Sequence, residues 1–107
     1  MEARPRVIES YQRADGKCPY ERWFRTIARL PAAKRVAVRL ERAEDGNLGD
    51  RRSVGEGVWE LRIDFGEGYR VYYGEDGDKL ILLTGGTKAS QDSDIADAKE
   101  YWRDYNA

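Results

Sequence analysis

The chain has 107 residues, of which 40% are hydrophobic and 11% aromatic, enough for one domain with a modest core. With one cysteine and no histidine it cannot form an internal disulfide, and a zinc site or a Cys-His nucleophile is disfavoured. It also lacks an apolar run long enough for a membrane span and an apolar N-terminal segment of the secretory kind. We therefore expect one cytoplasmic domain over residues 1–107, since a lone Cys18 fits a reducing compartment.

The net charge of −1 is unevenly distributed along the chain. Residues 1–64 carry 14 Lys and Arg against 11 Asp and Glu, whereas residues 65–107 carry 5 against 9. A protein that binds nucleic acid unaided is usually basic overall. Any contact with nucleic acid must therefore use a local patch or a partner that positions the protein.

The N-terminal half predicts one strand and two helices. Residues 5–11 alternate like a half-buried strand, and Pro19 suits the first turn of a helix. Apolar residues then recur at three- and four-residue steps up to Leu30, which is typical of a helix face packed on a core. Pro31 should break this helix, and a second is expected over residues 32–45. Together they form a helical hairpin that can cover one face of a sheet.

The second helix carries Arg35, Arg39 and Arg42 on one face. Such a face has two interpretations. It is either a solvated surface or a docking surface for an RNA backbone, which Arg51 and Arg52 in the following loop would extend. We expect that loop to run over residues 46–57.

Residues 58–88, VWELRIDFGEGYRVYYGEDGDKLILLTGGTK, predict three strands joined by turns at 65–68 and 74–78. Residues 80–83 are apolar on both sides, so the third strand should be central. Alternation in the first two strands places Arg62, Arg70 and Tyr72 on the polar side of the sheet. Lys88 follows the last strand directly. Three cations at one end of one sheet suggest a phosphate site, although Arg62 could instead lie in surface ion pairs with Glu60 and Asp64.

After residues 85–88, Ser90, Asp92 and Ser93 are candidate caps for a last helix whose apolar face is rich in aromatic residues. The expected architecture is α+β. It consists of a small antiparallel or mixed sheet of about four strands, the N-terminal helical hairpin on one face and a C-terminal helix.

This order of elements, with the segments ELR, GYRVYY, GGTK and DIADAKEYW, resembles the RelE/HigB-type toxin superfamily with its RelE/ParE-like fold. The resemblance is greatest to the phage-derived addiction-module killer proteins of type II toxin–antitoxin systems. It implies a ribosome-dependent endoribonuclease, or mRNA interferase, that inhibits translation by cutting messenger RNA and needs no cofactor or metal. It also implies a cognate antitoxin, a small helix-turn-helix DNA-binding protein, and no association with a membrane.

By the same resemblance, Arg70 of GYRVYY matches the catalytic arginine of the family. Arg62 and Lys88 match flanking basic positions. In cleavage by the ribose 2′-hydroxyl, arginine suits the charged phosphorane, and Lys88 could stabilise or protonate the leaving 5′-oxygen. Tyr72 could stack on a base.

The chain departs from the family pattern in two places. Glu60 and Arg62 stand where paired lysines are usual, so one of the two is acidic. Gln91, Asp92 and Asp94 are found where a tyrosine or histidine is expected near the start of the last helix. The general acid and the general base are therefore open, and the candidates for the base are Glu60, Asp64, Asp94 and Tyr72. The alternative function is a non-enzymatic protein of the same fold that binds an antitoxin or inhibits DNA gyrase.

Overall fold

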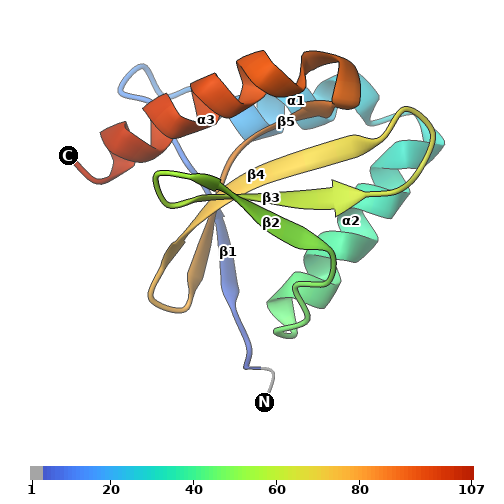
Figure 1. The fold of residues 1–107 in the computed structure, drawn as a ribbon, viewed down its shortest axis with the longest axis horizontal. Helices are drawn as coiled ribbons and strands as arrows, with labels where there is room; N and C mark the ends of the chain where they lie inside the picture. Colours follow the sequence, from blue (N-terminus) through green and yellow to red (C-terminus); the bar gives the residue numbers. More distant parts are fainter. Residues whose placement is uncertain (1–3) are drawn as a thin grey trace.

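The computed structural model describes residues 4–107, which fold into a five-stranded sheet with helices on both faces (Figure 1). The elements in chain order are β1 (Val7–Ser10), α1 (Pro19–Ile27), α2 (Pro31–Glu44), β2 (Arg51–Gly55), β3 (Val58–Ile63), β4 (Tyr69–Asp76), β5 (Lys79–Thr87), the 3₁₀ turn η1 (Lys88–Ser90) and α3 (Gln91–Tyr105). The fold is therefore α+β. Within residues 4–107, no helix is both long enough and apolar enough to cross a membrane.

The sheet is mixed, in the order β1-β5-β4-β3-β2. Strands β2 to β5 pair antiparallel as a meander, whereas β1 lies parallel to β5, with Val7 opposite Lys79. The strand β5 lies between β1 and β4, which confirms its expected central position. Its apolar residues serve both faces: Leu80 and Leu82 pack on one side, Ile81 and Leu83 on the other.

One face of the sheet is covered by α1 and α2, as the helical pattern indicates. Val36 and Ala43 of α2 are fully buried against Leu61, Val71 and Tyr73 of the sheet. Small residues on α2 let the helix lie close to the strands. This cluster is the larger part of the core.

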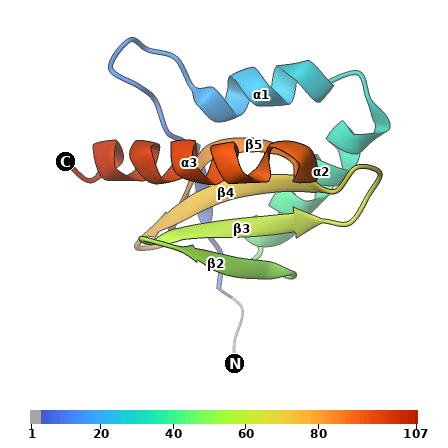
Figure 2. The ribbon, with the colours of Figure 1, turned by 45° about the horizontal axis from the view of Figure 1, so that its top comes forward.

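The opposite face, the predicted polar side of the sheet, is covered by α3. Ala98 of α3 is fully buried with Val58, Tyr72 and Leu83, and Ile95 packs against the same cluster. Figure 2 shows α3 in front of the sheet and α2 behind it. The sheet therefore has a core on both faces.

Four details differ from the expectations. The turn expected over residues 74–78 is confined to residues 77–78, because β4 continues to Asp76 and β5 begins at Lys79. The helix α1 ends at Ile27 rather than Leu30, because Leu30 precedes a proline and is extended (φ −91°, ψ 153°). Residues 28–30 therefore separate the two helices, and Pro31 begins α2 rather than only ending α1. The expected loop over residues 46–57 contains the fifth strand, β2, which pairs with β3 along one edge of the sheet.

Candidate active site

Arg62, Arg70 and Lys88 line a single hollow of about 400 Å³. Arg62 of β3 lies directly opposite Arg70 of β4 in the antiparallel register. Lys88 begins η1, and its backbone N–H donates to the carbonyl oxygen of Gly68 at 2.9 Å, so the end of β5 is fastened to the β3–β4 turn. The structure thus brings together the three cations that the sequence assigns to a phosphate site. We call this hollow the cationic hollow.

The two arginines differ in exposure. Arg62 and Lys88 are exposed, whereas Arg70 is only 7% exposed.

The cationic hollow also contains three carboxylates, those of Asp50, Asp64 and Glu67. Its formal charge is therefore close to zero, and free RNA would gain little from long-range attraction.

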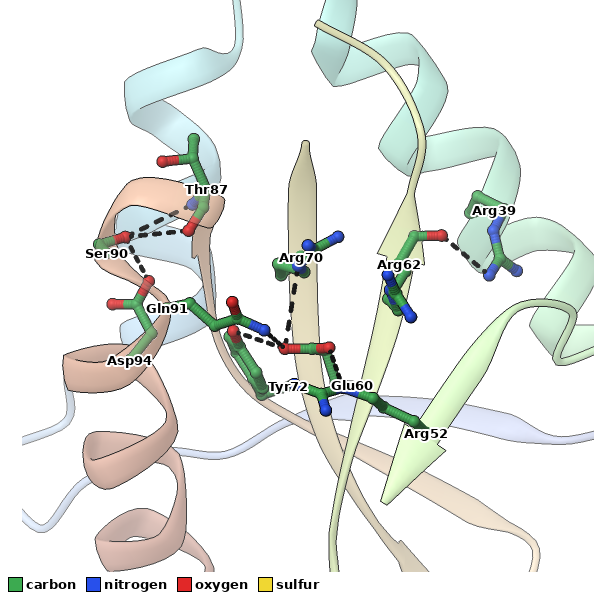
Figure 3. Close-up of polar contacts among 10 residues, drawn as sticks. All are labelled: Arg39, Arg52, Glu60, Arg62, Arg70, Tyr72, Thr87, Ser90, Gln91 and Asp94. Carbon is green, nitrogen blue, oxygen red and sulfur yellow. Dashed lines mark hydrogen bonds and ion pairs between the residues drawn. The ribbon is translucent and has the colours of Figure 1, made fainter. Parts of the chain in front are cut away.

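Arg70 is held beside a buried carboxylate. Glu60 is fully buried, and its Oε2 atom lies 3.9 Å from Nε of Arg70 (Figure 3). Within residues 4–107, Arg70 Nε has no hydrogen-bond partner. The guanidinium is therefore fixed by a long ion pair and by burial, without a full set of hydrogen bonds.

Three donors from three elements converge on Glu60 (Figure 3). Nε of Arg52 donates to Oε1 at 2.9 Å. The Tyr72 hydroxyl and Nε2 of Gln91 donate to Oε2 at 3.0 and 2.9 Å. We call these residues, with Arg70, the Glu60 cluster. It ties β2, β3, β4 and the first residue of α3 together beneath the cationic hollow.

The cluster keeps Glu60 ionised. Burial alone would raise the pKa of the Glu60 carboxyl, but the hydrogen bonds from Arg52, Gln91 and Tyr72 and the charge of Arg52 together lower that pKa below its ordinary value. Burial and the neighbouring Glu60 charge raise the pKa of Tyr72 far above its ordinary range, so its hydroxyl keeps its proton. Glu60 is therefore an anion at neutral pH that positions Arg70.

This geometry corrects the interpretation of Tyr72 as a base-stacking residue. Its side chain is fully buried under α3 and donates to Glu60, so it has no free ring face for a nucleobase.

Glu60 and Tyr72 are equally inaccessible as general bases. Asp94 accepts a hydrogen bond from Ser90, burial raises its pKa, and it does not line the cationic hollow. Asp64 does line it.

Arg51 and Arg52 do not form one RNA-binding surface, because adjacent residues of a strand point to opposite faces. Arg51 lies over the Trp59 ring at 4.1 Å and donates to the Tyr73 hydroxyl at 3.0 Å and to Glu75 at 3.3 Å. Arg52 points to the α3 face and binds Glu60. Both arginines therefore have structural partners.

The predicted arginines of α2 line a second hollow of about 290 Å³ with Lys34, Val38, Ile63 and Asp64. Arg35 lies over the Phe65 ring at 4.8 Å, and Arg42 is exposed. Arg39 donates to the carbonyl oxygens of Leu48 and Asp50 at 3.0 and 2.9 Å, so it holds the loop before β2. We call this the α2 hollow.

Gly86 of the GGTK segment explains how α3 approaches the sheet. A Cβ atom at this position would overlap the Asp94 carboxylate and lie 2.8 Å from Ser90 Oγ. The residue opposite Gly86 in the register is Arg70. The missing side chain therefore lets the start of α3 lie next to the strand that carries Arg70.

The Glu60 cluster was not predicted from the sequence, and neither was the role of Gln91 as a hydrogen-bond donor to Glu60. The available signal was an acidic residue in a strand of otherwise apolar and basic residues, together with the glutamine just after GGTK. Neither residue reveals from its position alone that the two side chains meet.

The fold and the cationic hollow define a small α+β protein in which the buried Glu60 positions Arg70, one of the three cations of the hollow. The chain is 44% identical over 81 residues to an uncharacterized protein of Haemophilus influenzae, an alignment that covers 75% of this chain and 82% of that protein. The chain belongs to the same family as that protein. No family model matches the chain, and no solved structure matches it.

Proposed function

We propose that this protein is the toxin of a toxin–antitoxin module and an endoribonuclease that cleaves messenger RNA on the ribosome. The observation that carries the proposal is the convergence of Arg62, Arg70 and Lys88 on one hollow. The resemblance of the ELR, GYRVYY and GGTK segments, which contain these three residues, to RelE/HigB-type toxins also supports it.

The arrangement suits attack by a ribose 2′-hydroxyl on the adjacent phosphate. The transition state gains negative charge on its nonbridging oxygens, and a fixed guanidinium can bind two such oxygens at once. Arg70 fills this role because Glu60 and burial restrict its motion. Preorganised cations of this kind contribute several kcal/mol to lowering a barrier, of the order of 3 kcal/mol for one donor.

Arg62 and Lys88 act from the exposed sides of the cationic hollow. Arg62 binds a phosphate next to the scissile one, and Lys88 stabilises or protonates the leaving 5′-oxygen. The reaction yields a 2′,3′-cyclic phosphate and a 5′-hydroxyl end. The near-neutral hollow fits a cytoplasmic enzyme whose RNA is presented by the ribosome and whose activity a cognate antitoxin blocks.

The proposal is tested by inducing the protein in bacteria and mapping transcript 5′ ends. Wild type should cut transcripts, and Arg70→Ala should cut about 10²- to 10³-fold more slowly. Arg70→Lys should recover only part of the rate, because lysine lacks the planar fork. Arg22→Ala, at an exposed residue of α1, is the matched control. If wild type and Arg70→Ala leave transcripts equally intact while both are folded, the nuclease proposal is wrong.

The three carboxylates of the cationic hollow favour one second candidate, a non-enzymatic member of the same fold. An electrically balanced hollow could bind a protein surface, either the antitoxin or DNA gyrase. Growth arrest with DNA-damage signalling and uncut transcripts would support the gyrase form of this alternative. A short helix-turn-helix protein encoded next to this chain would support a toxin role under either candidate.

A further inference from the structure

The cationic hollow and the α2 hollow meet at one residue. Within residues 4–107, Asp64 is the only residue that lines both. Lys34, Arg35 and Arg42 line the α2 hollow with it, and Arg62, Arg70 and Lys88 line the cationic hollow with it. Asp64 is therefore the carboxylate shared by the two groups of cations.

We infer that Asp64 is the general base that removes the proton from the attacking 2′-hydroxyl. This inference rests on the proposed function and adds to it a residue for a role that the resemblance leaves open. Asp64 directly follows Ile63, the last residue of β3, and is exposed.

The Asp64 carboxylate is available for this role because no group of the described residues binds it. Within residues 4–107 its carboxylate makes no hydrogen bond and no ion pair, although it lines two hollows that contain cations. A carboxylate left free between phosphate-binding groups costs RNA affinity, since it repels the backbone. A chemical role accounts for that cost.

The other carboxylates fit the role less well. Glu60 is fully buried behind Arg70, and Asp94 is bound to Ser90. The Asp50 charge acts on Arg39, and Glu67 lies in the β3–β4 turn and lines only the cationic hollow. Among these carboxylates, only Asp64 lines both hollows.

The step balances as follows. The Asp64 carboxylate takes the 2′-hydroxyl proton, and O2′ forms a bond to the adjacent phosphorus. The bond from phosphorus to the 5′-oxygen breaks, and its electron pair leaves with that oxygen, which takes a proton from Lys88 or from water. The products are the 2′,3′-cyclic phosphate, the 5′-hydroxyl end and a protonated Asp64, which returns its proton to solvent.

The test is a single-turnover cleavage assay on ribosomes programmed with a synthetic messenger RNA, using wild type, Asp64→Asn and Asp64→Glu. Asp64→Asn should lower the maximal rate about 10²-fold or more, the usual contribution of a general base. It should not weaken binding, because it removes a negative charge from an RNA-binding surface. Asp64→Glu should recover part of the rate. Thermal unfolding of the variants should match wild type.

A substrate with sulfur in place of the leaving 5′-oxygen separates the base from the acid. Sulfur leaves without protonation, so this substrate should restore Lys88→Met if that residue is the acid, and it should not restore Asp64→Asn. A merely structural Asp64 would not produce this difference. Glu41→Gln is the matched control, since it removes a carboxylate charge from an exposed position of α2 that lines neither hollow, and it should not slow the maximal rate.

The outcomes distinguish the inference from the function on which it depends. If wild type cleaves and Asp64→Asn cleaves equally fast, the base is not Asp64 and the nuclease proposal stands. If Asp64→Asn is slow but the sulfur substrate restores it, Asp64 acts on the leaving group and the inference is also overturned. If folded wild type does not cleave at all, the nuclease proposal itself fails.

Discussion

Replacing Glu60 with glutamine tests the buried cluster beneath Arg70. The substitution keeps the volume of the side chain, so any effect arises from charge and hydrogen bonding. The carboxylate accepts from Arg52, Tyr72 and Gln91 and lies 3.9 Å from Arg70. A glutamine amide offers one acceptor oxygen and points N–H groups at some of these donors.

The expected cost follows from the burial of both charges. Glu60 is fully buried and Arg70 is 7% exposed, so Glu60→Gln leaves a buried guanidinium without its anion. Removing one partner of a buried pair costs about 3–5 kcal/mol. For a domain of this size, that corresponds to a fall in melting temperature of roughly 12–20 °C.

Urea unfolding followed by circular dichroism measures this loss, and the slope with urea should not change. Arg52→Gln is the matched control. The Arg52 side chain is 51% exposed and Glu60 keeps its other donors, so the loss should be about 1 kcal/mol or less.

The pH dependence gives a second readout. Because the folded state lowers the pKa of Glu60 below its ordinary 4.5, the folded protein binds fewer protons than the unfolded chain below that pH. Wild type should lose stability as the pH falls from 4.5 through the folded pKa, and its advantage over Glu60→Gln should shrink. Equal urea midpoints at pH 7 for wild type and Glu60→Gln would refute the assignment of Glu60 as a buried anion.

Two further predictions concern the packing around the site. Gly74→Ala should destabilise the protein by about 1–3 kcal/mol, because the new Cβ would lie 2.5 Å from the ring of Trp102. It should also shift the tryptophan fluorescence. Unchanged stability would show that α3 can move away freely. Burial raises the pKa of Tyr11 and Tyr20 from 10.0 to about 12, so the folded state should lose stability as the pH rises from 10 to 12. In a spectrophotometric titration, ionisation of these phenols should coincide with unfolding. Ionisation near pH 10 without unfolding would contradict this prediction.

Much of the fold follows from periodicity. The meander over residues 58–88 and the three helices have strong local patterns, and the central position of β5 follows from its apolar residues on both faces. The strand β2 could not be predicted in this way. Its sequence, RRSVG, has no alternation of apolar residues, because it is an edge strand whose pairing with β3 depends on the neighbouring strand rather than on its own composition.

The candidate site could be predicted only in part, for a related reason. Alternation correctly assigns Arg62 and Arg70 to one side of adjacent strands, and register then places them opposite each other. It also assigns Glu60 and Tyr72 to that side, but it cannot say that α3 covers them. Burial on that face depends on a helix that begins at Gln91, far along the chain, and local patterns carry no information about such contacts.

The parallel pairing of β1 with β5 has a consequence for synthesis. Val7 lies opposite Lys79, so the first strand has no partner until some 72 further residues have been made. At typical elongation rates this takes roughly 4–15 s. Lys88 and α3 are made later still, so a nascent or truncated chain cannot assemble the cationic hollow. Under the proposed function, no cleavage is expected until α3 has been made, a delay in which a partner made beforehand can be waiting.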